Sequence, residues 1–301
     1  MPEPRIPQSV EGVVEVEVFR SAESRYWLLI EVPHGATRRS DYDAVAKKMK
    51  STLPAQLEHF FYVNTDIGAP EGARWIGKLL GSHRVNVVVA RCLIPRTFID
   101  TNRVIGTQSG EGLTGSMPTY ITDSNDQTYL QGLHAQYHRV VDTLYNEVCR
   151  NADGLALQLH SYAPKSVGIE KVDSNIVKAL HAAYEPATYA TWPDRPAVDL
   201  ICATKDGNFR PAPRLVAAAV KAWAEAGVTA TENGTYHLHP VTMGMEYARA
   251  FPHQVLCVEL NRGLIADPFG PFGESPISDS KVGLLVAPVA RVLHSALAEP
   301  V

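Results

Sequence analysis

The sequence predicts an α/β fold: a single domain with a mostly parallel or mixed central sheet and helices on both faces. Two observations predict it. Runs rich in β-branched residues and Leu, typical of strands buried on both faces, alternate with amphipathic segments of helical period along most of the 301 residues. No repeat, low-complexity tract or linker interrupts this alternation. One domain over residues 1–301 is therefore preferred to the two that ~150 residues per domain would suggest.

The expected elements follow from these two patterns. The apolar runs expected to form strands are Val13–Phe19, Tyr26–Pro33, Val85–Cys92, Gly154–His160, Val198–Ala203 and Gln254–Leu260. The amphipathic segments expected to form helices are Asp41–Lys50, Pro70–Leu80, Gln127–Arg150, Pro213–Ala226 and Ser280–Ala298. Ser40 is the expected N-cap of the first helix. The Gly-, Ser- and Thr-rich segment Gly106–Asp126 is long enough for a loop that acts as a lid.

Composition excludes several classes of function. The chain has 28 Lys and Arg residues against 32 Asp and Glu residues, a net charge of −4 without a basic stripe, so we expect no nucleic-acid partner. No apolar run approaches the ~18 residues of a membrane span, and the first residues lack the apolar core of a signal peptide. The four cysteines are widely spaced without a CxxC pair. We expect buried, reduced thiols in a cytoplasmic protein that has no membrane partner.

Common catalytic motifs are absent. The sequence contains no GxSxG elbow, no GxxxxGK[ST] phosphate loop and no GxGxxG after a strand. This absence argues against serine hydrolases, nucleoside-triphosphatases and nucleotide-dependent dehydrogenases.

Polar residues end three of the expected core strands. His34 follows the run at Tyr26, His160 ends the run at Gly154, and Glu259 lies near the end of the run at Gln254. Ligands of open α/β sheets bind at the carboxyl ends of the strands. Each residue alone is compatible with an ordinary hydrogen-bonding loop position, but three at one edge favour a site.

A fourth polar group follows the expected strand Val85–Cys92. Asp100, Asn102 and Arg103 offer a carboxylate, an amide and a guanidinium within four residues. Arg binds a carboxylate through two parallel hydrogen bonds, and Asn adds a directional donor. The segment therefore predicts a clamp for a substrate carboxylate, and the alternative is a surface turn with an Asp–Arg pair.

These residues together resemble the N-formylglutamate amidohydrolase family, which is similar in fold to the zinc carboxypeptidases. The resemblance extends from about Tyr26 to Arg262. The matching pieces, in chain order, are Pro33-His34-Gly35, Asn64-Thr65-Asp66, Arg96–Arg103, Tyr137-His138, His160-Ser161, the region of Thr242, and Val258-Glu259-Leu260.

The resemblance implies one divalent metal, zinc by preference, held by His34, Asp66 and His160. Three protein ligands with an open position are typical of catalytic zinc. The carboxypeptidases take their carboxylate ligand three residues after the first histidine, where this chain has Thr37, so Glu71 is a rival to Asp66.

The remaining roles also come from the resemblance. Asp100 is implied as the carboxylate that orients His34 from behind. Glu259 is implied as the general base, and Arg96 as the group that stabilises the oxyanion or shares the substrate carboxylate. The residues implied to contact substrate are Asn102, Arg103, His138 and Tyr236.

The expected function is that of a metal-dependent hydrolase acting on a small substrate that carries a carboxylate. It cleaves an N-acyl, formyl-like amide bond of an amino-acid derivative. The segment Thr235–Pro240 departs from the family's pattern, so the reaction class is implied rather than formylglutamate itself. Two alternatives stay open: a metallocarboxypeptidase acting on peptides, and a ligand-binding relative without catalysis. Neither the native metal nor the oligomeric state follows from the sequence.

Overall fold

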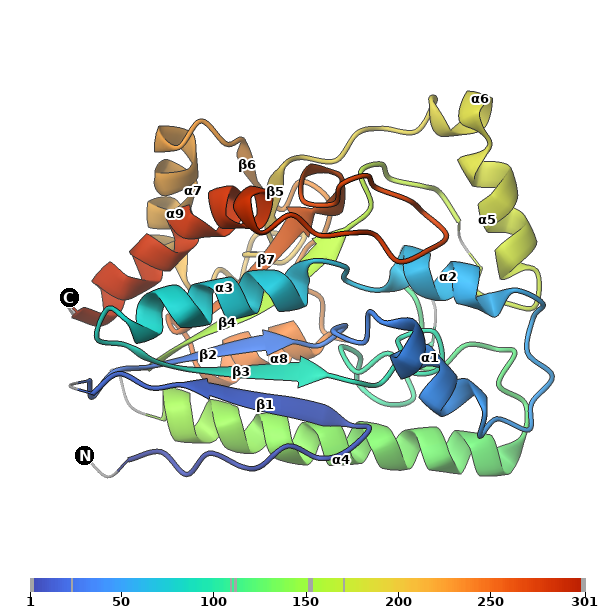
Figure 1. The fold of residues 1–301 in the computed structure, drawn as a ribbon, viewed down its shortest axis with the longest axis horizontal. Coiled ribbons are helices and arrows are strands. Elements are labelled where there is room, and N and C mark those ends of the chain that lie inside the picture. The colour runs from blue at the N-terminus through green and yellow to red at the C-terminus, as the bar shows by residue number, and fades with distance from the viewer. Residues whose placement is uncertain are drawn as a thin grey trace.

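A computed structural model describes residues 3–22, 24–108, 110, 113–150, 154–169 and 171–298. Within these residues one seven-stranded sheet has the order β1-β3-β2-β4-β7-β5-β6 (Figure 1). Its strands are β1 Val14–Phe19, β2 Trp27–Val32, β3 Asn86–Cys92, β4 Gly154–Tyr162, β5 Val198–Leu200, β6 Ala230–Glu232 and β7 Val255–Asn261.

The sheet is mixed, with a parallel centre. Strands β3, β2, β4 and β7 run parallel to one another, whereas β1 pairs antiparallel with β3 and β5 pairs antiparallel with β7. The carboxyl ends of β2, β4 and β7 therefore lie at one edge of the sheet. This confirms the geometry expected for His34, His160 and Glu259.

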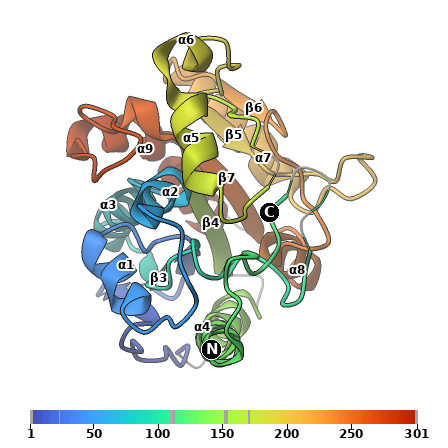
Figure 2. The same cartoon turned by 90° about the vertical axis from the view of Figure 1, so that its right-hand side faces the viewer.

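Helices cover both faces of the sheet (Figure 1). Helices α3 Ala69–Gly81, α7 Pro213–Glu225 and α9 Asp279–Ala298 pack on one face, and α4 Ser124–Cys149 and α8 Met243–Ala250 pack on the other. The shorter helices are α1 Arg39–Ala46, α2 Leu57–Asn64, α5 Ile176–Tyr184, α6 Pro186–Tyr189 and the 3₁₀ turn η1 Arg262–Leu264. Helices α1, α2, α5 and α6 gather at the carboxyl edge of the central strands, which faces the viewer in Figure 2.

Most expected elements are present, with shifted ends. The strand expected at Val198–Ala203 stops at Leu200, because the backbone N–H groups of Cys202 and Ala203 donate to the side-chain oxygen of Asn233 instead of to a neighbouring strand. Helix α1 begins at Arg39, so Ser40 is inside it and is not its N-cap. Strand β6 and helices α2, α5, α6 and α8 were not expected.

Helix α9 corrects the expectation about apolar runs. It is the one helix of the described residues that is long and apolar enough to cross a membrane by length and composition. Half of it is buried, and it packs on α3 and α7. These contacts are those of a core helix covering a sheet face. The four cysteines are free and buried, as expected.

Candidate active site

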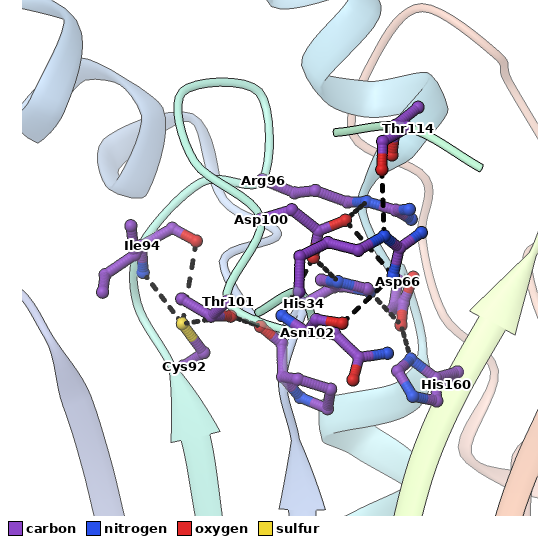
Figure 3. A network of polar contacts seen from close by, with 12 residues as sticks. His34, Asp66, Cys92, Ile94, Arg96, Asp100, Thr101, Asn102, Thr114 and His160 are labelled. Atoms are coloured by element: carbon purple, nitrogen blue, oxygen red, sulfur yellow. Dashed lines mark hydrogen bonds and ion pairs between the residues drawn. The ribbon is translucent and has the colours of Figure 1, made fainter. Parts of the chain in front are cut away.

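Two histidines and one carboxylate meet at the carboxyl edge of the sheet (Figure 3). Asp66 Oδ2 lies 2.8 Å from His160 Nδ1 and 3.3 Å from His34 Nδ1. All three side chains are buried, and their potential ligand atoms lie within 4.8 Å of one another. These residues come from three separate segments of the sequence, and the fold places them together.

The local backbone explains two pieces of this arrangement. A Cβ at Gly35 would lie 2.7 Å from Arg91 Cγ and 3.0 Å from the Val32 carbonyl oxygen, so the chain after His34 can pass there only as glycine. Thr65 ties the end of α2 to the same turn, since its hydroxyl donates to the carbonyls of His34 and Ala36. These contacts bring Asp66 beside His34.

The outer nitrogen of each histidine has its own partner. His34 Nε2 lies 2.8 Å from Asp100 Oδ1, and His160 Nε2 lies 3.2 Å from Gln158 Oε1. Both partner atoms are acceptors and can hold a proton on Nε2, and each Nδ1 faces Asp66 Oδ2. A metal bound at this point would take the Nδ1 lone pairs and leave the ring protons on Nε2, held by Asp100 and Gln158.

The donor set fits a divalent metal. Tetrahedral bonds of ~2.1 Å place the ligand atoms of a zinc site about 3.4 Å apart, close to the separations around Asp66 Oδ2. Two neutral imidazoles and one carboxylate are ligands of catalytic zinc sites. The group His34, Asp66 and His160 could therefore hold one metal ion.

The rival ligand does not belong to this group. Glu71 lies in the first turn of α3, and the cluster of potential ligands among the described residues contains Asp66 instead. Thr37 lies before α1, where its backbone N–H donates to Asp41. The carboxylate therefore reaches the histidines from the end of α2, not from the residues that follow the first histidine.

Opposing charges fix the protonation of the two aspartates. Burial alone would raise the pKa of Asp100, but Arg103, Arg96 and His34 hold it well below its usual range. Burial likewise opposes ionisation of Asp66, but the two histidines keep its pKa low. Both groups are therefore carboxylates at neutral pH.

Glu259 has the opposite electrostatic environment. Burial raises its pKa to about 7, an effect that His160 partly opposes. Its Oε2 is buried without a hydrogen-bond partner among the described residues. Glu259 is the register partner of His160 across β4 and β7, and it lines the same cavity. A carboxylate with this pKa and an unpaired oxygen can take up and release a proton near neutral pH.

A cavity of about 420 Å³ opens beside these residues. Arg96, Asn102 and Arg103 line it together with the histidines. Arg103 Nε donates to the Thr114 carbonyl and its Nη1 to the Asn102 carbonyl, while Nη1 lies 3.7 Å from Asp100 Oδ2. Asn102 Oδ1 accepts from the N–H of Gly244, which turns the amide nitrogen away from α8. The guanidinium therefore both pairs with Asp100 and borders the cavity.

Two expected substrate contacts have different positions. Tyr236 lines the cavity, and its hydroxyl accepts from Arg195 Nη2. His138 does not line the described cavity: it lies on α4, where Nε2 faces the Thr101 carbonyl at 2.9 Å. Burial lowers the pKa of His138 to about 4, so it is neutral and donates to that carbonyl. Its observed contact supports the loop of Asn102 rather than a ligand.

The expected lid lies partly beside the cavity. Leu113 and Thr114 line it, whereas residues 109, 111 and 112 of the segment Gly106–Asp126 are outside the described residues. Lid movement stays a prediction.

Sequence reasoning missed several polar residues that line the cavity, among them Gln158, Arg195 and Arg262. Gln158 precedes His160 by two positions on β4, a spacing that places both side chains on one face of the strand and was available as a signal. Arg262 follows Glu259 at the end of β7. Arg195 lies over the rings of Tyr162 and Tyr236. It comes from a loop that had no distinguishing pattern.

Comparisons with known proteins show the fold. No protein-family model matches the chain, and no curated protein sequence matches it. Among solved structures, the N-formylglutamate amidohydrolase of Ralstonia eutropha JMP134 is similar over 95% of this chain and 99% of that chain, with 14% identity and a TM-score of 0.60. A gene product of Agrobacterium tumefaciens is similar over 95% of both chains, with 16% identity and a TM-score of 0.56.

Proposed function

We propose that this protein is a metal-dependent hydrolase that cleaves the N-acyl amide bond of a small amino-acid derivative carrying a carboxylate. One observation supports it above the others. The buried group of His34, Asp66 and His160 lies with Glu259 at one edge of the sheet, beside a cavity that Arg103 lines. The similarity in fold to an N-formylglutamate amidohydrolase agrees with this reaction class.

The chemistry divides between the metal and the chain. A divalent metal bound by His34, Asp66 and His160 (the triad) would act as a Lewis acid and lower the pKa of its bound water to ~7. Glu259 takes the proton that the attacking water loses and transfers it to the leaving amine nitrogen, so the acyl carbon gains the hydroxyl and the amine leaves neutral. The raised pKa of about 7 makes Glu259 suited to both transfers.

The chain's other residues would orient the substrate. Arg103 and Asn102 would bind its carboxylate, because an arginine side chain that borders the cavity presents N–H groups in the fork geometry that carboxylates accept. Arg96, held by Asp100 at 2.9 Å, would stabilise the negative oxygen that develops on the acyl carbon. Tyr236 would contact the substrate beside Arg195.

Two other functions use the same residues. A metallocarboxypeptidase would cleave the last residue from a peptide, and an inactive relative would bind a carboxylate ligand without turnover. The unpaired Oε2 of Glu259 favours an enzyme over a binding protein, since a buried carboxylate oxygen without a partner costs stability unless the site uses it.

The test combines metal analysis with a substrate panel. Purified protein is analysed for Zn, Mn, Fe, Co and Ni, and each loaded form is offered N-acyl amino acids and N-blocked dipeptides. We expect stoichiometric metal and release of free amino acid from the N-acyl amino acids. Cleavage of dipeptides alone would support the carboxypeptidase, and bound metal without any turnover would support the binding protein.

A further inference from the structure

The cavity has two chemically different walls. The polar wall carries the histidines, Glu259 and Arg103. The apolar wall is formed by α2, α5 and the segment before α5. Its lining side chains are Phe60, Val63, Val167, Ile169, Val172, Ile176, Leu180 and Tyr184. Phe60, Ile176 and Leu180 are buried, and they belong to the core that supports this wall.

This wall exceeds what a formyl group needs. A volume of about 420 Å³ would hold about fourteen waters at the ~30 Å³ that each occupies in the liquid. A formyl group adds only one carbon and one oxygen to an amino acid, and it leaves apolar side chains facing water. Apolar side chains grouped in a cavity with a few directed polar groups are typical of sites that bind an apolar ligand part.

We propose that the substrate carries a bulky apolar group, of benzyl or hexanoyl size, that packs against α2 and α5. This rests on the proposed function and specifies its substrate class. The apolar group belongs either to the acyl part or to the amino-acid side chain, since both flank the scissile amide.

The experiment compares four substrates on the metal-loaded protein. N-formyl-alanine is small on both sides, N-formyl-phenylalanine is apolar in the side chain, and N-hexanoyl-glycine and N-benzoyl-glycine are apolar in the acyl group. We expect kcat/KM for one apolar class to exceed that for N-formyl-alanine by at least ~10-fold, the discrimination that apolar pockets reach per methylene or more. The class preferred identifies which part occupies the wall.

Variants assign the preference to this wall. Leu180→Ala and Ile169→Ala should lower kcat/KM for the apolar substrate by ~10-fold or more and leave N-formyl-alanine within ~2-fold. Val177→Ala is the matched control, because Val177 is buried on the same helix α5 and does not line the cavity. Equal rates on all four substrates would overturn the apolar class and leave the hydrolase intact, whereas no turnover of any substrate would overturn the proposed function itself.

A second, independent observation concerns a buried carboxylate outside the cavity. Glu31 on β2 is fully buried, and no cation pairs with it among the described residues. Instead, Tyr137 donates to Oε1 at 2.8 Å, and Tyr145 and Gln158 donate to Oε2 at 2.9 Å each. A buried carboxylate is tolerated only when donors of this kind surround it.

Glu31 determines how the Gln158 amide is turned. Glu31 Oε2 accepts from the Gln158 nitrogen, which leaves Gln158 Oε1 facing His160 Nε2. Burial raises the pKa of Glu31, and the hydrogen bond from Gln158 opposes this shift. The amide is also enclosed: a Cβ at Gly244 would lie 2.6 Å from Oε1, and Cys257 Sγ contacts the same oxygen at 3.7 Å. The amide is held in one orientation.

We infer that Glu31 and Gln158 are positioning residues that hold the His160 ring in the orientation a metal ligand needs. Gln158 Oε1 faces Nε2, so Nδ1 is directed toward Asp66. Replacing Glu31 with an amide removes this constraint, because an amide can donate to Gln158 and let its nitrogen turn toward His160, where it cannot accept the Nε2 proton.

The test reads the metal site directly. In the Co²⁺-loaded protein the visible absorption bands report how the ligands surround the ion, and we expect Glu31→Gln to change their position or intensity relative to the parent protein. Chelator competition should show ~10–100-fold weaker Co²⁺ and Zn²⁺ binding in Glu31→Gln and in Gln158→Leu, the range typical of groups that orient metal ligands.

Tyr145→Phe is the control. It removes one donor to Glu31 without changing the acceptor that faces Gln158, so melting temperature should fall while metal affinity changes by less than ~3-fold. Unchanged metal affinity in Glu31→Gln, or a Co²⁺ spectrum identical to that of the parent protein, would overturn the inference. Because Glu31→Gln preserves size, it keeps the test decisive if Gln158→Leu fails to fold.

Discussion

The two histidines of the triad occupy equivalent places and have different support. His34 follows β2, and His160 lies near the end of the neighbouring parallel strand β4. Behind His34 lies the carboxylate of Asp100, which also pairs with Arg96 and approaches Arg103. Behind His160 lies the neutral amide of Gln158. The charged side of the site is therefore the one that supports His34. The neutral side supports His160 through the Gln158 amide, which in turn donates to Glu31.

This difference separates two tasks. On the charged side, the arginines that Asp100 holds also line the cavity. In the proposed function, the support of His34 and the binding of the substrate would therefore share one carboxylate. On the neutral side, Gln158 orients His160 while Glu259 on the adjacent strand keeps an unpaired oxygen. A charged support beside Glu259 would shift its pKa away from the raised value of about 7, and a neutral amide does not. The neutral side therefore suits proton transfer.

Removing the proposed general base, Glu259, should cause the largest loss of activity. Glu259→Gln keeps the shape and removes proton transfer, so we expect kcat to fall by ~10²–10⁴-fold with metal content unchanged. Glu71→Gln is the matched control, because Glu71 is another partly buried glutamate of this chain and lies outside the triad. Near-normal turnover in Glu259→Gln on a verified substrate would make Glu259 structural.

Substitutions at Arg103 test the charged side of the site. Arg103→Ala should lower kcat/KM for a carboxylate substrate by ~30–5,000-fold, which corresponds to the ~2–5 kcal/mol lost when one partner of a buried charge pair is removed. Arg103→Lys should also lower it, since the ammonium lacks the two-pronged geometry. A substrate with its carboxylate amidated should already be poor and lose little more. Equal losses on both substrates, with a lower melting temperature, would assign Arg103 to structure alone.

Asp100→Asn sharpens the comparison between the two supports. It weakens the hold on His34, so metal affinity should fall by ~10–100-fold, as for Gln158→Leu. It also leaves Arg96 and Arg103 without their carboxylate, so KM for the carboxylate substrate should rise at saturating metal. Gln158→Leu at saturating metal should leave that KM unchanged. Identical KM values in the two variants would contradict the division of tasks.

The smallest expected effect is a pH dependence. Glu259 accepts a proton only as a carboxylate, so kcat/KM should decrease as the pH falls through its pKa. That pKa is about 7 without metal, and a bound cation lowers it, so the limb should lie at or below pH 7 with a slope of about one decade per unit. The residual activity of Glu259→Gln should lack this limb. A limb of unchanged position in that variant would assign it to another group.

Local pattern was enough for the central part of the fold. The strands β2, β3, β4 and β7 were readable because buried parallel strands are continuous apolar runs, and β1 because its Val and Glu residues alternate. Helices α3, α4, α7 and α9 were readable because their apolar residues repeat at helical spacing. The short elements were not readable. Helix α2 has eight residues and starts after Gln56, which is not a typical capping residue, so it carries no start signal. Helix α5 follows Asn175 but has only nine residues, too few to show a clear helical repeat.

The sequence by itself determined which polar residues lie at or near the ends of the core strands, because a strand buried on both faces carries few polar residues before it leaves the sheet. His34, His160 and Glu259 were identified in this way, and the resemblance added Asp66 and the role of Asp100. The tertiary structure decided what each residue touches. Gln158 and Glu31 were hidden inside apolar runs, and their hydrogen bond joins residues 127 positions apart. His138 was expected at the substrate, but the packing of α4 places it under the loop of Asn102. Strand ends are visible to local pattern, whereas a hydrogen bond across the sheet depends on strand order and register, which no single segment contains.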